Sequence, residues 1–217
     1  MKSKKTPWPT EKAMTQVYEN KLWGTNGTAF YSGEGSHDIG LVQPYIQMVQ
    51  TFLNSFDHKL NVCDLGCGDF NVGKNLVDFT NQYVGVDIVP SLIKHNQSVF
   101  KSDGLKFVCL DLAKDTLPSS DCLLVRQVLQ HLSNNEITAF VPKLYTYKYV
   151  LLTEHIPSND FIPNKDIISG QGIRIKKKSG VDLLASPFNY KPKKSHRLLS
   201  LPLEGNKGKI ETWLYEN

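Results

Sequence analysis

Five short apolar runs occupy the middle of the chain, separated by polar segments or by segments of helical spacing. The runs begin at Leu60, Tyr83, Leu105, Cys122 and Tyr149, and each consists mostly of consecutive apolar residues. Strands that are buried on both faces have this pattern, whereas half-buried strands alternate apolar and polar residues. The runs therefore predict a parallel sheet with helices packed on both of its faces.

The segments between and around these runs predict the helices. Residues 41–56 carry apolar side chains spaced by three and four positions, which is the pattern of an amphipathic helix. A helix from about residue 134 is expected to be capped by Ser133 or Asn134, with Glu136 in its first turn. The other expected helices cover residues 10–22, with Thr10 as N-cap, 72–79 and 91–100.

After the fifth run the pattern changes. Residues 157–195 contain several glycines and prolines and have no clear period, as is common in long functional loops. Residues 196–201 and 209–215 have the composition of two strands joined by a turn with two glycines. We expect this pair to close the sheet in an antiparallel arrangement.

The first apolar run leads into a glycine-rich turn, Asp64-Leu65-Gly66-Cys67-Gly68-Asp69. Its glycines allow the backbone to turn tightly and to approach a ligand, which the first amides of a following helix would also face. Such a turn at the start of a doubly wound sheet binds a nucleotide. Asn71 stands in place of the third glycine of the dinucleotide fingerprint, and the two carboxylates would repel a pyrophosphate but attract a cation. S-adenosylmethionine is the common ligand that is both cationic and ribose-bearing.

The run from Val62 to Asp69 resembles the first motif of class I S-adenosylmethionine-dependent methyltransferases. The resemblance extends over roughly 62–154 and implies S-adenosylmethionine as the cofactor. It also implies an α/β fold: a Rossmann-like, seven-stranded, mostly parallel sheet with helices on both faces and the last strand antiparallel. The lead-in, with Tyr18-Glu19, Leu22-Trp23-Gly24 and residues 32–36, looks loosely like that of bacterial methyltransferases associated with glycan biosynthesis.

A chain of 217 residues is long enough for one domain with a sizeable core. We expect a single methyltransferase domain with four parts. These are an N-terminal helical lead-in or lid (1–58), a cofactor-binding core (59–156), a substrate insertion (157–195) and closing strands (196–217).

Several residues are expected to contact the cofactor. Asp87 ends the second run, where a carboxylate can accept both ribose hydroxyls, and the next residue would pack on the adenine. The resemblance implies that Asp111 and its neighbour contact the adenine and that the residues after Val125 lie beside the methionine and the methyl group. Asp87 could instead form a turn, Asp111 could cap a strand, and the glycine-rich stretch before residue 40 could be a connector. The full expected set is Trp23, Ser36, Asp64, Gly66, Cys67, Gly68, Asp87, Ile88, Asp111, Leu112, Arg126 and Gln127.

Three residues at expected strand ends could act as the catalytic base: His131, Glu154 and His155. A neutral imidazole or a carboxylate can take the proton of an acceptor hydroxyl. His131 could instead be a surface histidine that caps a helix, and Glu154 or His155 could hold the substrate. Because a hydroxyl needs a base more than an amine does, these candidates favour O-methylation of a small molecule or a saccharide. The acceptor could be anionic, since lysines and Arg174 in the long insertion could bind a phosphate or carboxylate.

The formal net charge is +4, and the lysines are concentrated in the C-terminal third. A nucleic-acid methyltransferase is therefore an alternative, although no Asn/Asp-Pro-Pro-Tyr/Phe motif follows Val125. A nicotinamide oxidoreductase is disfavoured by Asp69 and Asn71. A cofactor-binding subunit without catalysis is the third alternative.

No apolar run approaches the length of a membrane span, and the first residues lack the apolar segment of a signal peptide. We therefore expect a soluble, cytoplasmic protein. The four cysteines agree with this, because no second pair or histidine cluster accompanies Cys63 and Cys67. Reduced thiols rather than a metal site are the expectation.

Overall fold

A single seven-stranded sheet, in the order β3-β2-β1-β4-β5-β7-β6, organises the molecule. The structure is a computed structural model that describes residues 7–217, so residues 1–6 of the expected lead-in lie outside the described residues. The strands are β1 (Asn61–Leu65), β2 (Gln82–Asp87), β3 (Leu105–Cys109), β4 (Cys122–Arg126), β5 (Tyr149–Ile156), β6 (Lys194–Pro202) and β7 (Lys209–Glu216).

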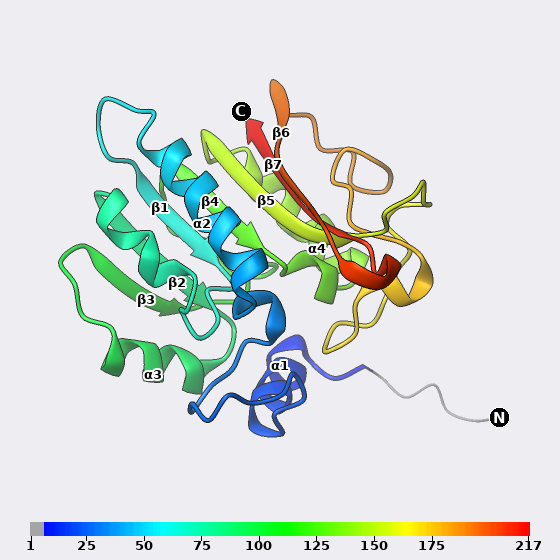
Figure 1. Ribbon diagram of the computed structural model, residues 1–217, viewed down its shortest axis with the longest axis horizontal. Helices are drawn as coiled ribbons and strands as arrows, with labels where there is room; N and C mark the ends of the chain where they lie inside the picture. The colour runs from blue at the N-terminus through cyan, green and yellow to red at the C-terminus, as the bar shows by residue number, and fades with distance from the viewer. Residues whose placement is uncertain (1–6) are drawn as a thin grey trace.

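The first five strands are parallel, and β7 runs antiparallel between β5 and β6. The β6–β7 hairpin therefore closes one edge of the sheet (Figure 1). The carboxyl ends of β1, β2, β4 and β5 meet at one edge, because their registers pair Leu65 with Val86 and Val125, and Val125 with Leu152. The expected Rossmann-like, mostly parallel seven-stranded fold is confirmed.

Helices cover both faces of the sheet, as the apolar runs predict. On one face, α2 (Ile39–Leu53) and α3 (Pro90–Val99) pack over the sheet with residues 70–79. On the other face, α4 (Asn134–Leu144) packs over the central strands together with buried side chains from residues 181–190 (Figure 1). The part of the long loop nearest β6 thus fills core space that a further helix would otherwise occupy.

The start of α4 agrees with its predicted capping residues. The Ser133 hydroxyl accepts from the Glu136 amide, and the Glu136 carboxylate accepts from the Ser133 amide at 3.1 Å. This reciprocal pair satisfies two amides that the helix itself cannot.

The prediction of a helix over residues 72–79 is wrong. The chain forms two short 3₁₀ turns instead, Gly73–Asn75 and Val77–Phe79. The Asn75 side-chain amide donates to the carbonyls of Asn71 and Val72 and so competes for backbone groups that a regular helix would use. The expected helix dipole behind the ligand is therefore absent from this turn.

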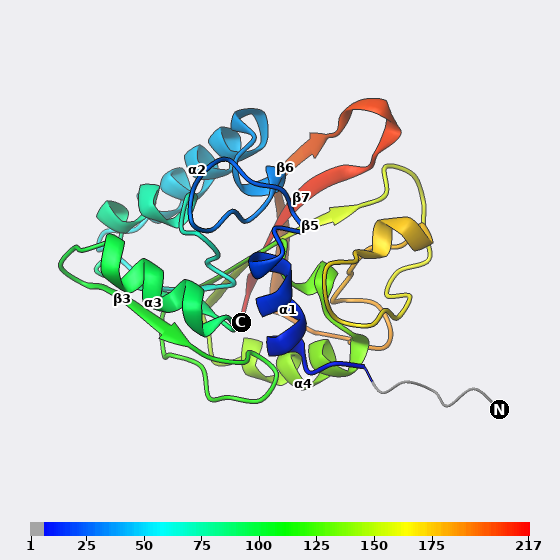
Figure 2. The same cartoon turned by 90° about the horizontal axis from the view of Figure 1, so that it is seen from below.

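The first helix, α1 (Thr10–Glu19), ends before Leu22, and its N-cap is Pro9 rather than Thr10. The Thr10 hydroxyl donates instead to the Glu136 carboxylate at the start of α4. Helix α1 lies across the carboxyl ends of the parallel strands, together with residues 20–38 (Figure 2). We call residues 20–38 the front segment.

Residues 157–193, between β5 and β6, contain one short 3₁₀ helix, Arg174–Lys177, and are otherwise irregular. Within the described residues, no helix has the length and apolar character that a membrane crossing requires.

Candidate functional site

A cavity of about 280 Å³ lies at the carboxyl ends of β1, β2 and β4, beneath α1 and the front segment. Open α/β sheets bind ligands at this edge. All twelve residues expected to contact the cofactor line this one cavity, although they come from five separate parts of the chain. They are Trp23, Ser36, Asp64, Gly66, Cys67, Gly68, Asp87, Ile88, Asp111, Leu112, Arg126 and Gln127.

The glycine turn, residues 64–69, has the tight geometry expected of it. Gly66 and Gly68 have φ values of 71° and 55°, in the region that favours glycine. The amides of Gly66 and Cys67 both donate to the Val86 carbonyl, which fixes the turn to β2. A Cβ on Gly66 would lie 2.3 Å from Val128 Cγ2, so only glycine fits against this neighbour.

Asp87 is buried at the end of β2, directly beside the glycine turn. Its Oδ2 accepts from the Gly68 amide at 3.2 Å, and its Oδ1 accepts from the Val89 amide at 3.1 Å. Burial raises the pKa of Asp87 to about 6, although both backbone hydrogen bonds favour the ionised form. The Asp87 carboxylate is a buried hydrogen-bond acceptor held rigidly at the cavity wall.

Asp64, at the other end of the glycine turn, accepts from the Tyr83 hydroxyl at 2.8 Å. Burial raises its pKa to about 6, and the nearby Arg126 guanidinium opposes this rise. Asp64 and Arg126 thus place opposite charges at the same end of the cavity.

Asp69 ties the front segment to the glycine turn. Its Oδ2 accepts from the Ser32 amide at 2.8 Å and lies 2.6 Å from His37 Nε2. In return, the Asp69 amide donates to the Ser32 hydroxyl at 2.8 Å, and that hydroxyl also lies 3.0 Å from the Tyr18 hydroxyl. Asp69 was expected to attract a cationic ligand. In this structure its carboxylate binds the Ser32 amide and the His37 side chain instead.

Arg126 and Gln127 follow β4 and face the front segment. Arg126 Nη2 donates to the Gly35 carbonyl at 2.6 Å, and its guanidinium carbon lies 4.9 Å from the centroid of the Tyr45 ring. Gln127 has a φ of 57°, a strained value for a side chain of this size. Among the described residues, no atom accepts a hydrogen bond from the buried donors Arg126 Nε and Gln127 Nε2. Orphaned buried donors and local strain are typical of a ligand site.

Asp111 lines the cavity beyond the end of β3, but both of its oxygens already have partners. Oδ1 accepts from the Ala113 amide at 2.9 Å, and Oδ2 lies 2.6 Å from Lys114 Nζ. The Asp111 carboxylate therefore caps the backbone after β3, which is the alternative role that the sequence left open. Leu112, the next residue, also lines the cavity.

Of the three candidate bases, only His131 lines the cavity. Its ring centroid lies 5.2 Å from that of Trp23, and its Nδ1 lies 3.1 Å from the Gly170 carbonyl oxygen. Burial lowers the pKa of His131 to about 4, so the imidazole is neutral at pH 7. Since Nδ1–H donates to Gly170, the lone pair lies on Nε2, which is 3.3 Å from Gln130 Nε2.

The structure does not bring Glu154 and His155 together with His131. The buried Glu154 carboxylate accepts from the amides of Leu129 and Gln130, at 3.0 and 2.9 Å. His155 Nε2 lies 2.7 Å from the Lys207 carbonyl oxygen, beside the β6–β7 turn. Neither residue lines the cavity.

Arg174 is also placed differently from expectation. The sequence suggested that it could bind a phosphate or carboxylate, but its side chain is 1% exposed and donates to three backbone carbonyls and to Asn134 Oδ1. No residue of the segment 157–195 lines the cavity.

Several lining residues were not expected from the sequence. Tyr45 and Tyr83 carry hydroxyls into the site from positions with the apolar spacing of a core helix and a core strand. Thr10, Met14 and Tyr18 come from α1, which the sequence placed in a lead-in or lid without indicating which of its side chains reach the cavity. The pairing of Ser32 with Asp69 could have been suspected only from the polar, glycine-rich composition of the front segment.

Comparisons with known proteins agree with this architecture. Residues 62–147 match the model of a family described as a methyltransferase domain. No curated protein matches the sequence significantly.

Many solved structures resemble the fold at low sequence identity. The magnesium protoporphyrin IX methyltransferase from Synechocystis PCC 6803, with bound SAM, is 14% identical, with 99% of this chain and 100% of that chain covered and a TM-score of 0.60. The N-methyltransferase NodS from Bradyrhizobium japonicum WM9, with bound S-adenosyl-l-homocysteine, is 9% identical over 82% of this chain and 87% of that chain, with a TM-score of 0.59.

Human N-acetylserotonin methyltransferase, in complex with SAM, is 17% identical over 82% of this chain, with a TM-score of 0.52. This chain covers only 56% of that larger protein. At such identities the likenesses establish the fold. The family match covers residues 62–147, less than half of the chain, and identifies this part as similar to a methyltransferase domain.

Proposed function

We propose that the cavity holds S-adenosylmethionine and that the enzyme transfers its methyl group to a hydroxyl of a small molecule or a saccharide. The observation that carries this proposal is the single cavity in which all twelve expected cofactor residues meet. Within it, Asp87 would accept the ribose hydroxyls, Leu112 would meet the adenine, and the glycine turn would hold the methionine part. Arg126 and Gln127 would then find the acceptors that their buried donors lack.

The transfer needs alignment and proton removal. The acceptor oxygen would attack the methyl carbon in line, the carbon–sulfur bond would break with its electrons going to sulfur, and S-adenosylhomocysteine would leave. Of the three candidate bases, His131 is the one that lines the cavity. Its neutral imidazole can accept the hydroxyl proton at Nε2 once the Gln130 side-chain amide moves away from this nitrogen. Because Glu154 and His155 lie outside the cavity, the proposal of a hydroxyl oxygen rather than an amine nitrogen as the methyl acceptor rests on His131.

The charges of the lining favour an uncharged acceptor over an anionic one. Among the described residues that line the cavity, Arg126 is the only lysine or arginine. Six carboxylates line the same cavity, and they belong to Glu34, Asp64, Asp69, Asp87, Asp111 and Glu136. A phosphate or carboxylate on the acceptor would be repelled by this surplus of negative charge.

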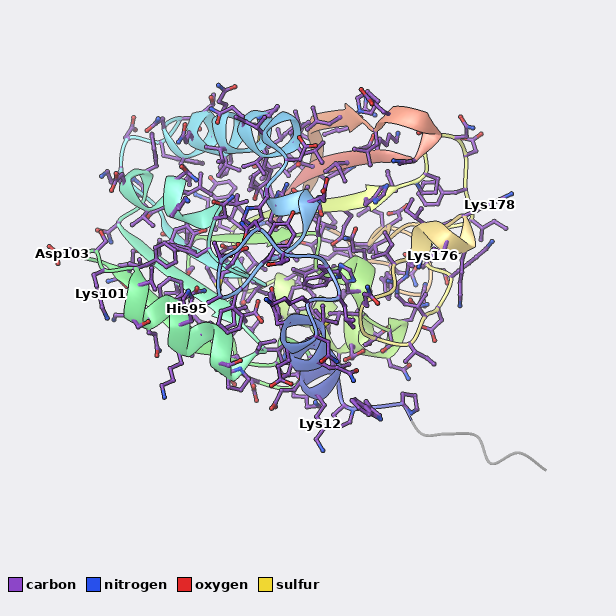
Figure 3. The ribbon with its side chains drawn as sticks, turned by 60° about the horizontal axis from the view of Figure 1, so that its bottom comes forward. Lys12, His95, Lys101, Asp103, Lys176 and Lys178 are labelled. Atoms are coloured by element: carbon purple, nitrogen blue, oxygen red, sulfur yellow. The ribbon has the colours of Figure 1, made fainter. Side chains whose placement is uncertain are left out.

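The lysines of the C-terminal third do not support nucleic-acid binding at this site. Lys176 and Lys178 point outward on one side of the molecule, away from Lys101 and from Lys12 on α1 (Figure 3). Lys194 begins β6 and lies opposite Glu216, at the amino end of β5 and away from the cavity. A phosphate backbone needs basic side chains along one continuous surface.

Calorimetric titration with S-adenosylmethionine, S-adenosylhomocysteine and NAD tests the cofactor assignment. We expect micromolar binding of the two adenosyl-sulfur ligands, no binding of NAD, and a loss of binding in Asp87→Ala. Asp103→Ala, which removes an exposed carboxylate, is the matched control. Failure of both adenosyl-sulfur ligands to bind the wild-type protein would refute the proposed cofactor site.

A screen of neutral alcohols and sugars, read out as S-adenosylhomocysteine formed, tests the acceptor. Replacing His131 with Asn should lower kcat at least about a hundredfold and leave the Kd of S-adenosylhomocysteine unchanged, because a general base contributes 10²–10⁴-fold. Unchanged kcat in this variant would show that His131 is not the base. Salt-sensitive methylation of RNA would favour the nucleic-acid alternative, and binding without any turnover would favour a non-catalytic subunit.

A further inference from the structure

The short turn after β4 forms one wall of the cavity. It comprises residues 128–132 and includes the 3₁₀ helix Leu129–His131. Val128 packs against the glycine turn, since its Cγ2 occupies the space that a Cβ on Gly66 would need, and His131 packs against Trp23. Any shift of this turn therefore changes the distance between the glycine turn and the side chains that face it.

Glu154 holds the 128–132 turn by its amides. Its two oxygens accept separately from the backbone N–H groups of Leu129 and Gln130. The Glu154 side chain is 3% exposed, so no water competes for these bonds. Burial raises the pKa of the Glu154 carboxyl to about 8, and the two amides and Arg174 favour its ionised form.

Arg174 holds the same turn by its carbonyls. Nη1 donates to the Leu129 carbonyl at 2.9 Å, and Nη2 donates to the Leu132 carbonyl at 2.7 Å. Nη2 also donates to Asn134 Oδ1, and Nε donates to the Lys165 carbonyl, so all three guanidinium nitrogens bind the chain. The planar fork of an arginine can bind two carbonyls at fixed spacing, which a lysine cannot.

We infer that Glu154 and Arg174 are positioning residues for methyl transfer: from outside the cavity, they fix the wall that the 128–132 turn presents to the cofactor. The inference rests on the proposed function of the cavity. It also gives the segment 157–195 a role other than acceptor binding, because this segment delivers the Arg174 side chain to the turn. Burial disfavours the charged form of both Glu154 and Arg174, and each of the two groups favours the charged form of the other.

Amide hydrogen exchange and cofactor affinity test this inference in Glu154→Gln. A glutamine offers one acceptor oxygen instead of two, so we expect the exchange of the Leu129 and Gln130 amides to accelerate at least about tenfold. The Kd of S-adenosylhomocysteine should rise about tenfold, and kcat should fall more, since a displacement of about 1 Å can cost about a hundredfold in rate. Arg174→Met should have similar effects, and Arg174→Lys should recover part of them.

Glu211→Gln is the matched control. Glu211 lies directly opposite Glu154 in the β5–β7 pair and is 5% exposed, but its partners are Lys209, Arg197, Ser200 and Trp213 rather than the turn. We expect this variant to change thermal stability while the Kd of S-adenosylhomocysteine stays within about twofold of wild type.

A Glu154→Gln protein that loses stability as Glu211→Gln does, with unchanged Kd and unchanged exchange at Leu129 and Gln130, would overturn the inference. If Glu154→Gln does not fold, the Arg174→Lys and Arg174→Met pair gives the same comparison. If the wild-type protein does not bind S-adenosylhomocysteine, the proposed function fails instead. In that case the exchange rates of the Leu129 and Gln130 amides still show whether Glu154 holds the 128–132 turn.

Discussion

Replacing Asp87 with Asn should stabilise the ligand-free protein at neutral pH while weakening its hold on the cofactor. Asp87 is buried, and its pKa in the folded protein is about 6, above the ordinary value of 3.8. The folded state therefore binds the proton more tightly than the unfolded state does. The ionised carboxylate costs stability that is absent at acidic pH, grows as the pH rises through the interval from 3.8 to about 6, and is constant above it.

The magnitude follows from the shift of about two pKa units, since each unit corresponds to about 1.4 kcal/mol. The unfolding free energy of Asp87→Asn, relative to wild type, should rise by about 2–3 kcal/mol between pH 4 and pH 7. Opposing this, Asn has one acceptor for the two amides of Gly68 and Val89, a loss of about 1 kcal/mol that does not depend on pH. The variant should thus be slightly less stable than wild type at pH 4 and more stable at pH 7.

Urea unfolding of both proteins at pH 4, 5, 6 and 7, with linear extrapolation, measures this difference. Asp103→Asn gives the background change from removing one surface carboxylate. In parallel, the Kd of S-adenosylhomocysteine should rise about tenfold or more at pH 7, because a hydrogen bond to a charged group contributes about 1.5–3 kcal/mol. Stability profiles that stay parallel for wild type and Asp87→Asn would refute the reasoning about the buried carboxylate.

Two further predictions concern the glycine turn and its contact with the front segment. Gly66→Ala should lower the unfolding free energy by at least about 2 kcal/mol, because alanine is strained at this left-handed position and its Cβ clashes with Val128. Gly172→Ala, with open space around it, should leave the unfolding free energy unchanged in the same urea titration. Ser32→Ala removes the acceptor of the Asp69 amide, so we expect protease cleavage within residues 20–38 to accelerate several-fold while the global stability is unchanged. An unchanged cleavage rate would mean that this hydrogen bond does not hold the front segment.

More of the expected cofactor residues than of the candidate bases line the cavity, for a physical reason. Asp87 could be placed because a parallel strand and its carboxyl end follow from an apolar run, and every such end meets the same edge of the sheet. Glu154 also lies at such an end, yet alternation along β5 turns it away from the cavity and towards the amides of Leu129 and Gln130. A position at the end of a strand therefore does not show whether a side chain reaches the cavity, since neither Glu154 nor His155 lines it.

Contacts that depend on long-range packing were not predictable. Arg174 sits among three lysines in a polar loop, where its sequence context suggests solvent exposure, but the backbone carbonyls of a distant turn bury it. The helix expected over 72–79 failed because Asn75 caps carbonyls within the segment. Hydrophobic periodicity contains no information about either event.

The front segment and α1 also impose a time scale on the enzyme. They lie over the cavity and are tied to the glycine turn through the Ser32–Asp69 pair, so we expect the cofactor to exchange more readily when those bonds open. Such an exchange would add a conformational step to each turnover. A first turnover that is faster than all the following ones, with a lag when the enzyme is preloaded with S-adenosylhomocysteine, is the kinetic behaviour expected of a site covered in this way.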